Sequence, residues 1–308
     1  MKSPFGWLTL CLLVCSLACG AAESPPRLSG DYLGQDPPGR TARLFAPGFV
    51  STQHGELNAV FANDAREFYF TRRGIAVGPA TIMVTKQIDR YWIQPEAIDF
   101  DRRYSAIDMF IAADGNRMVF CSNRPHTRDA EPRGHHDLWV SVRDGDSWST
   151  PELFAPAAMS EAQEFYPIVA LSGNLYFNSQ REGQGTNNIY RSALQQGEYG
   201  PAEKLPQPIN SEYREFDAYV SPGEDMIIFS SERPGGFGDA DIYVSFLTDA
   251  GGWTEPRNLG AEVNSPASEY GSMPSPDGRY LFFTSGRDGN ENVYWISAEV
   301  VEALRPDS

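Results

Sequence analysis

The stretch Phe229-Ser-Ser-Glu-Arg-Pro-Gly-Gly-Phe-Gly-Asp-Ala-Asp-Ile-Tyr243 combines a strand end, a glycine-rich turn and the start of a second strand. It decides the fold because its parts recur at intervals of roughly 50 residues, which indicates a repeat architecture. The first part recurs as Phe70-Thr-Arg-Arg73, Phe120-Cys-Ser-Asn-Arg124, Phe177-Asn-Ser-Gln-Arg181 and Phe283-Thr-Ser-Gly-Arg287. The last part recurs as Thr81-Ile-Met83, Asp137-Leu-Trp139, Asn188-Ile-Tyr190 and Asn292-Val-Tyr294.

Each copy contains four short predicted strands joined by turns. Apolar runs such as Tyr280-Leu-Phe-Phe283 are nearly continuous, as in a sheet that is buried on both faces. Units of four strands without intervening helices are typical of propeller blades, which must stack around an axis to bury their faces. The copies over residues 42–297 therefore predict an all-β, five-bladed β-propeller of four-stranded blades. A six-bladed ring is the alternative.

An outer strand is repeated at the beginning of this region. Leu44-Phe-Ala-Pro-Gly-Phe-Val-Ser51 is similar to Leu153-Phe-Ala-Pro-Ala-Ala-Met-Ser160, the outer strand of the second blade. The fifth blade lacks such a strand before the C-terminal tail, residues 298–308. We therefore predict that residues 42–50 supply the fourth strand of the fifth blade, which leaves no open sheet edge.

The N-terminus has the composition of an export signal. Lys2 precedes an apolar run over residues 7–14 that is too short to span a membrane, and small residues follow. Ser16-Leu-Ala-Cys19 resembles a bacterial lipobox. It predicts a signal peptide over residues 1–18, lipidation of Cys19 and a Pro/Gly-rich tether over residues 19–41. The alternative is cleavage after Ala22 and secretion.

Charge and cysteine content restrict the partners. The net charge of −16 is unfavourable for binding nucleic acid. Cys11 and Cys15 lie in the signal peptide and Cys19 is lipidated or removed, which leaves Cys121 alone, so no internal disulfide is expected. We expect an exported monomer in the periplasm or cell envelope that contacts the membrane only through its lipid.

A third phrase, Trp92-x-x-Pro95, recurs as Trp148-x-x-Pro151, Tyr199-Gly-Pro201 and Trp253-x-x-Pro256. The Phe-x-Ser-x-Arg, Asp-Ile-Tyr and Trp-x-x-Pro phrases together resemble the WD40-like propeller repeat of TolB-type envelope proteins. The resemblance covers about residues 52–297 and implies the propeller fold. It is less informative about function, because the family includes binding proteins, peptidase accessory domains and lipoproteins.

Residues that recur in every blade are expected to build blades. We assign this structural role to the repeated arginines and to the acidic residues that follow them, namely Arg124, Arg181, Arg233, Arg287, Asp137 and Asp241. A function requires residues that break the repeat.

The innermost strands begin with triplets that carry carboxylates. They are Glu56-Leu-Asn58, Ala106-Ile-Asp108, Glu164-Phe-Tyr166, Glu215-Phe-Asp217 and Glu269-Tyr-Gly271. Because side chains alternate along a strand, the first and third residues should share one face. The candidate ligand-binding residues at the channel mouth are therefore Glu56, Asp108, Glu164, Glu215, Asp217 and Glu269. Three interpretations remain open: structural capping and pairing with arginines, binding of a cation or basic peptide, or a glycosidase-like carboxylate pair about 5–9 Å apart.

The second blade carries an insertion, residues 125–137, with three of the four histidines. Their spacing fits no strong zinc signature, so we expect an exposed rim loop and predict no metal, no cofactor and no catalytic residue.

The expected function is a non-catalytic propeller of the bacterial cell envelope. Its ligand at the channel mouth would be an envelope protein, a cell-wall fragment or a small molecule. The alternative is a glycoside hydrolase-like enzyme that uses carboxylates from different inner strands.

Overall fold

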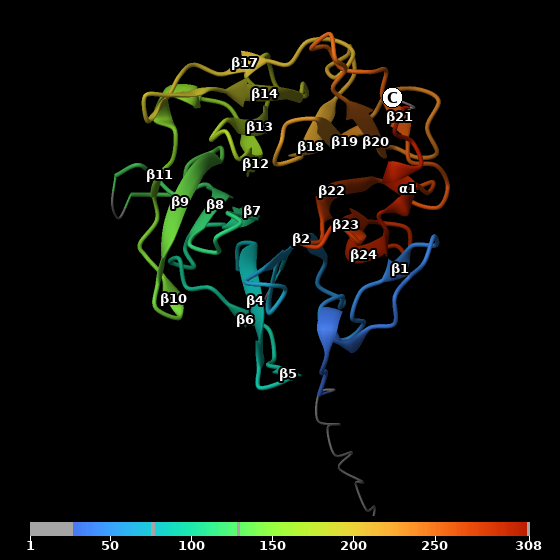
Figure 1. Ribbon diagram of the computed structural model, residues 1–308. Coiled ribbons are helices and arrows are strands. Elements are labelled where there is room, and N and C mark those ends of the chain that lie inside the picture. Colours follow the sequence, from blue (N-terminus) through green and yellow to red (C-terminus); the bar gives the residue numbers. More distant parts are fainter. Residues whose placement is uncertain (1–26, 75–77, 128–129, 307–308) are drawn as a thin grey trace, which may run out of the picture.

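The computed structural model describes residues 27–74, 78–127 and 130–306, and they form a five-bladed β-propeller (Figure 1). This confirms the predicted fold class. Each blade is an antiparallel sheet, and every inner strand contacts the inner strands of both neighbouring blades. The five inner strands therefore form a closed ring around the axis.

The blades follow one another along the chain. Blade 1 contains β2 (Glu56–Ala62), β3 (Glu67–Arg72), β4 (Thr81–Ile88), β5 (Tyr91–Trp92) and β6 (Glu96–Ala97). Blade 2 contains β7 (Ile107–Ile111), β8 (Arg117–Ser122), β9 (Asp137–Asp144), β10 (Ser147–Trp148) and β11 (Glu152–Leu153). Blade 3 contains β12 (Glu164–Val169), β13 (Leu175–Ser179), β14 (Asn188–Ser192) and β17 (Glu203–Lys204), with the hairpin of β15 (Leu194–Gln195) and β16 (Glu198–Tyr199) beside it. Blade 4 contains β18 (Glu215–Val220), β19 (Met226–Ser231), β20 (Asp241–Phe246) and β21 (Arg257–Asn258).

The N-terminal strand closes the ring as predicted. Blade 5 consists of β22 (Glu269–Pro274), β23 (Tyr280–Ser285), β24 (Asn292–Ser297) and β1 (Arg43–Leu44). Strand β1 pairs antiparallel with β24, with Arg43 opposite Trp295 and Leu44 opposite Tyr294. The outer edge of the last blade is therefore covered by the segment that precedes the first blade.

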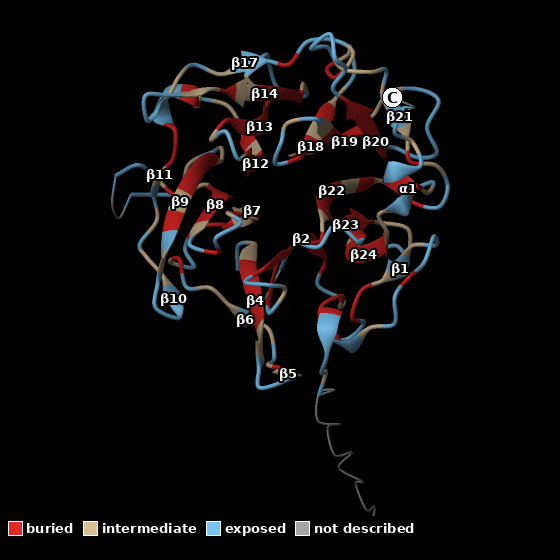
Figure 2. Ribbon diagram, in the orientation of Figure 1, coloured by how far each residue is buried: buried red, intermediate tan, exposed pale blue. Residues whose placement is uncertain are grey.

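The middle strands of the blades are largely buried (Figure 2). Between blades 5 and 1, buried aromatic side chains from several segments form an aromatic seam, which includes Phe45, Phe61, Phe68, Phe282 and Trp295. The ring of Phe45 lies 5.1 Å from that of Phe68 and 5.0 Å from that of Phe282, so one side chain touches both blades. Packed aromatic pairs of this kind stabilise beyond the area they bury.

The segments at both ends of the propeller pack against it. Residues 27–41 were expected to belong to the tether, but they contain a short 3₁₀ helix, η1 (Asp31–Gly34), whose Tyr32 and Leu33 are buried against the aromatic seam. The C-terminal tail contains the short helix α1 (Glu299–Glu302), which buries Val300 and Val301. Within the described residues, no helix is long and apolar enough to cross a membrane.

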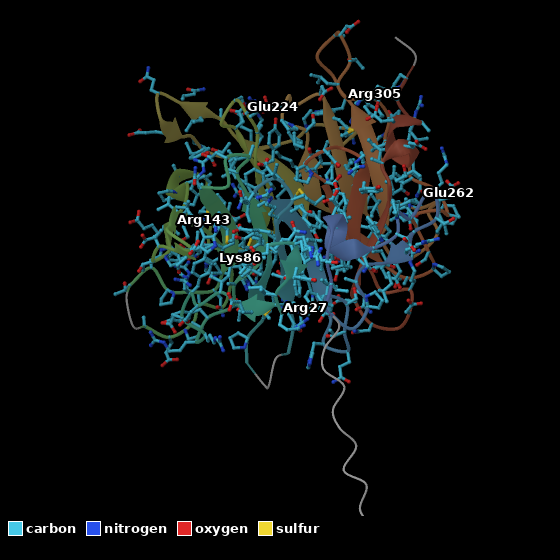
Figure 3. The ribbon with its side chains drawn as sticks, turned by 60° about the horizontal axis from the view of Figure 1, so that its bottom comes forward. Arg27, Lys86, Arg143, Glu224, Glu262 and Arg305 are labelled. Carbon is cyan, nitrogen blue, oxygen red and sulfur yellow. The ribbon has the colours of Figure 1, made fainter. Side chains whose placement is uncertain are left out.

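Ion pairs also join neighbouring blades. Arg143 of blade 2 donates to Glu67 of blade 1 at 2.7 Å, and Lys86 lies 4.0 Å from the same carboxylate. Figure 3 labels Arg143 and Lys86 near each other on one side of the molecule. Tyr69 also donates to Glu67 at 2.7 Å, so this carboxylate is satisfied within the interface.

Candidate functional site

The four glutamates at the start of the inner strands do not reach the channel mouth. Their side chains are buried, and each forms an ion pair with an arginine of its own blade. The pairs are Arg72–Glu56 at 2.8 Å, Arg181–Glu164 at 3.0 Å, Arg233–Glu215 at 3.3 Å and Arg287–Glu269 at 3.5 Å.

Each glutamate also caps the loop before its strand. The backbone N–H and the hydroxyl of the Ser or Thr four residues earlier donate to the carboxylate, as Ser211 does to Glu215 at 2.9 and 2.6 Å. The same arrangement is made by Thr52, Ser160 and Ser265. Of the three interpretations, structural capping and pairing with arginines therefore fits the glutamates, because the fold itself supplies the partners that compensate their burial.

A β-bulge explains why the first and third residues of each triplet do not share one face, as regular alternation predicted. The pairing of each inner strand with its neighbour breaks just after the second residue of the triplet. The third residue of every triplet then adopts a positive φ, and these residues are Asn58, Asp108, Tyr166, Asp217 and Gly271. A bulge turns one side chain away from the regular alternation, so the third residue does not share a face with the glutamate.

Neighbouring blades stabilise these bulges. The N–H of Asp108 donates to Thr71 Oγ1 of blade 1 at 3.4 Å, and the N–H of Asp217 donates to Asn178 Oδ1 of blade 3 at 3.2 Å. The bulges at Asp108 and Asp217 are thus each held by a side chain from the preceding blade. A strained backbone that its surroundings hold in place is typical of functional sites.

The bulges bring Asp108 and Asp217 to one pocket, although they belong to blades 2 and 4. This mouth pocket has a volume of about 530 Å³, and both aspartates line it together with Arg73, His136 and Tyr270. Among the described residues, neither aspartate forms an ion pair. Of the six predicted mouth residues, the structure therefore brings only these two together.

Burial makes both carboxyl groups weak acids. It raises the pKa of Asp108 to about 7, while Arg73 and a hydrogen bond from Asn58 act in the opposite direction. The pKa of Asp217 rises well above its ordinary value, first because of burial and then because of the negative charge of Asp108. Two desolvated carboxyl groups near each other hold protons at a pH where exposed ones would be ionised.

The third residues of two other triplets, Tyr166 and Asn58, make polar contacts between blades. Tyr166 of blade 3 donates its hydroxyl hydrogen to the carbonyl oxygen of Ser272 in blade 5 at 2.8 Å, which bridges the ring. Asn58 donates to Asp108 at 2.6 Å, but its own buried Oδ1 has no hydrogen-bond partner among the described residues.

A second polar chain, which the sequence analysis did not foresee, reaches the same pocket. Gln163 Oε1 accepts the backbone N–H of His136 and also contacts His136 Nδ1, both at 3.0 Å. The Gln163 oxygen therefore requires a proton on Nδ1, and Nε2 lies 2.7 Å from the hydroxyl oxygen of Ser105, which donates to Asn123 Oδ1 at 3.0 Å. Burial lowers the pKa of His136, which favours this neutral tautomer. His136 was expected on an exposed loop, and only the folded ring reveals its position.

The repeated acidic residues Asp137 and Asp241 begin strands β9 and β20, directly after a turn or loop. Asp241 accepts hydrogen bonds from the backbone N–H groups of Phe237 and Gly238 at 2.6 and 3.1 Å and so orders the glycine-rich turn. Asp137 pairs with Arg133 at 3.2 Å and contacts His126 at 3.0 Å.

In the part of the chain that the structure describes, no group of three or more His, Cys, Asp or Glu could hold a metal ion. The described thiol Cys121 is buried, and Cys19 lies outside the described residues.

No protein-family model matches the chain, and neither does any curated protein. Solved structures do match. A structure described as a glycoside hydrolase superposes with a TM-score of 0.56 and 11% identity, covering 90% of this chain and 94% of that one. The endo-arabinase from Bacteroides thetaiotaomicron gives 0.53 at 12% identity, covering 80% of this chain and 96% of the other. TolB from Acinetobacter baumannii gives 0.48 at 14% identity, covering 80% and 55%. At these identities the similarity shows the fold alone.

Proposed function

We propose that this protein is a non-catalytic binding propeller of the bacterial cell envelope that holds a small, hydroxyl-rich ligand in the mouth pocket. The observation that carries the proposal is the contrast between two kinds of buried carboxylate. The glutamates have arginine and hydroxyl partners within the fold, whereas Asp108 and Asp217 lie desolvated in a pocket without a described cationic partner within ion-pair distance. A ligand that donates hydrogen bonds would compensate this burial.

The composition of the pocket favours a sugar or a cell-wall fragment. Carboxyl groups accept hydroxyl hydrogens and, when protonated, donate to hydroxyl oxygens. Phe165 and Ile107 add an apolar surface beside them, and Arg73 adds a fixed positive charge. A few polar groups that converge on an apolar pocket of this size are typical of small-molecule sites.

A thermal-shift screen of the exported chain against sugars and cell-wall fragments tests the proposal. A ligand that binds only the folded state raises the melting temperature by mass action. We expect Asp217→Asn and Asp108→Asn to abolish the shift, and Asp249→Asn, which changes an exposed aspartate, to leave it unchanged. A ligand whose shift survives both pocket substitutions would contradict binding at the mouth.

Hydrolysis of a glycoside is the second candidate. It is favoured by the two carboxyl groups that line one pocket, because glycoside hydrolysis uses a pair of carboxyl groups that flank the bond to be broken. Glycoside hydrolases are also among the proteins that share the fold. Release of reducing ends from a glycan, lost in Asp217→Asn, would replace the non-catalytic proposal, whereas binding without turnover would reject this candidate.

We further propose that Cys19 anchors the protein in the envelope through a lipid. The lipobox-like sequence Ser16-Leu-Ala-Cys19 supports the proposal. Cys19→Ser should then release the protein into the soluble envelope fraction. Membrane association that persists in this variant would reject the anchor.

A further inference from the structure

Blade 2 departs from the arginine arrangement that the other four blades share. In all five blades an arginine Nη2 donates to a carbonyl oxygen in the segment that leads into the inner strand; the acceptors are Val50, Phe100, Ala158, Ile209 and Val263. In blades 1, 3, 4 and 5 the same arginine also reaches the glutamate that starts the inner strand. The position of the guanidinium group is therefore part of the repeat. Its ion pair with a glutamate is also part of the repeat in four of the five blades.

Blade 2 keeps the arginine but has lost its carboxylate. Ala106 occupies the glutamate position, and Arg102 occupies the position of the Ser or Thr that caps it. Arg124 is nonetheless buried, with 7% exposure, and it forms no ion pair with any residue in the described ranges. Its contacts are Ser122 Oγ at 3.3 Å, the carbonyl oxygen of Phe100 and the face of Trp139 at 5.2 Å.

A pocket opens at this unneutralised guanidinium. We call it the blade-2 pocket; it has a volume of about 480 Å³ and is lined by Arg124 and by the aromatic side chains Phe100, Tyr104, Trp139 and Trp148. It lies within blade 2 and beside the insertion, and it shares no lining residue with the mouth pocket. It is thus a second, separate cavity.

We propose that the blade-2 pocket binds the carboxylate of a sugar acid, with the ligand supplying the negative charge that glutamate supplies in the other blades. The planar guanidinium matches a carboxylate in geometry and forms charge-assisted hydrogen bonds with it. The tryptophan rings offer flat apolar surfaces to the sugar ring. A neutral sugar lacks the group that Arg124 requires and binds more weakly.

The acidic residues at the rim do not exclude such an anion. The negative charge of Asp101 acts on Arg124, but Asp101 also forms a forked pair with Arg103, with distances of 2.6 and 3.0 Å, which compensates part of this charge. Asp99 is exposed to solvent, where its repulsion is reduced by water and salt. Arg124, in contrast, is desolvated, and interactions with it are screened far less.

The test uses D-glucuronate as the probe and D-glucose as its neutral counterpart, both at millimolar concentrations. Binding is followed by tryptophan fluorescence, because Trp139 and Trp148 line the pocket, and by thermal shift. We expect glucuronate to bind at least about tenfold more tightly than glucose, as expected for a hydrogen bond to a charged group. Equal responses to both sugars, or no response to glucuronate, would overturn the proposal.

Two substitutions locate the response. Ala106→Glu restores the carboxylate of the other blades and should abolish glucuronate binding while keeping the fold, and Arg124→Gln should abolish it by removing the cation. Arg181→Gln, the matched change in blade 3, should keep binding in the folded protein. Glucuronate binding that persists in both Ala106→Glu and Arg124→Gln would overturn the proposal. Binding that is lost instead in Asp217→Asn would assign it to the mouth pocket, so the two proposals can fail separately.

Discussion

At the scale of single residues, the same chemical group has opposite roles according to its partners. Glu215 is fully buried, yet Arg233, Ser211 and Ser231 all donate to it. Asp217, two residues further along, is almost as deeply buried, but no described side chain donates to its carboxylate within hydrogen-bond distance. The first carboxylate has its partners within the blade, whereas the second lines the mouth pocket without such a partner.

Removing a repeated arginine should reveal this difference. Arg233→Gln leaves Glu215 buried without its cation, which should lower the free energy of unfolding by about 3–5 kcal/mol. Arg124→Gln leaves no buried carboxylate behind, because Ala106 stands at that position, so we expect a loss of about 1 kcal/mol. Urea denaturation measures both. Equal losses would mean that the ion pairs of the other blades contribute little.

The stability of the protein should also depend on pH through Asp217. Its pKa is raised in the folded state, so as the pH rises the unfolded chain loses the proton first and stability falls. Asp217→Asn removes this penalty. The substitution should therefore stabilise the protein more at about pH 8 than at about pH 5, by at least about 1 kcal/mol. Denaturation of wild type and variant at both pH values measures the difference, with Asp249→Asn as control. A pH-independent difference would show that Asp217 is ionised throughout.

At the scale of strands, the repeat predicts pairing well and side-chain direction poorly. The similarity of residues 44–51 to residues 153–160 correctly predicted that β1 pairs with β24. The inner strands were expected to alternate regularly, but a bulge interrupts each of them. A bulge adds no distinctive residue type here, since Asn, Asp, Tyr and Gly all occupy it. Its location depends on pairing with the next strand and therefore appears only in three dimensions.

Closure by β1 depends on one aromatic side chain. Phe45 is fully buried and touches Phe68 of blade 1 and Phe282 of blade 5. Phe45→Ala should lower the free energy of unfolding by about 3–5 kcal/mol, because it leaves a cavity in the aromatic seam. Leu171→Ala, at an exposed position, should change it by less than about 0.5 kcal/mol. If both variants lose equally little in urea denaturation, the seam does not hold the ring closed.

At the scale of the whole molecule, the two pockets depend on the ring in different ways. The mouth pocket combines residues from all five blades, including Leu57, Asp108, Phe165, Asp217 and Tyr270. No local sequence pattern could have assembled it, because its members are brought together only by closure. The blade-2 pocket lies within one blade and its flanking segments, and the missing glutamate was visible in the aligned triplets. The loss of the glutamate in blade 2 could therefore be recognised from the sequence, whereas the pocket beside it could not.

Closure also predicts how the molecule unfolds. In an open array of repeats the terminal units are free to unfold first, because each has only one neighbour. Here every blade packs against two others, and β1 ties the first blade to the last. We therefore expect one cooperative transition, in which tryptophan fluorescence and far-ultraviolet circular dichroism change together. Phe229→Ala in the buried middle strand of blade 4 and Phe45→Ala at the seam should both shift this single transition to lower urea concentration. Separate transitions for the two probes in the wild-type protein would mean that the blades unfold independently, and that the closing strand contributes shape but not cooperativity.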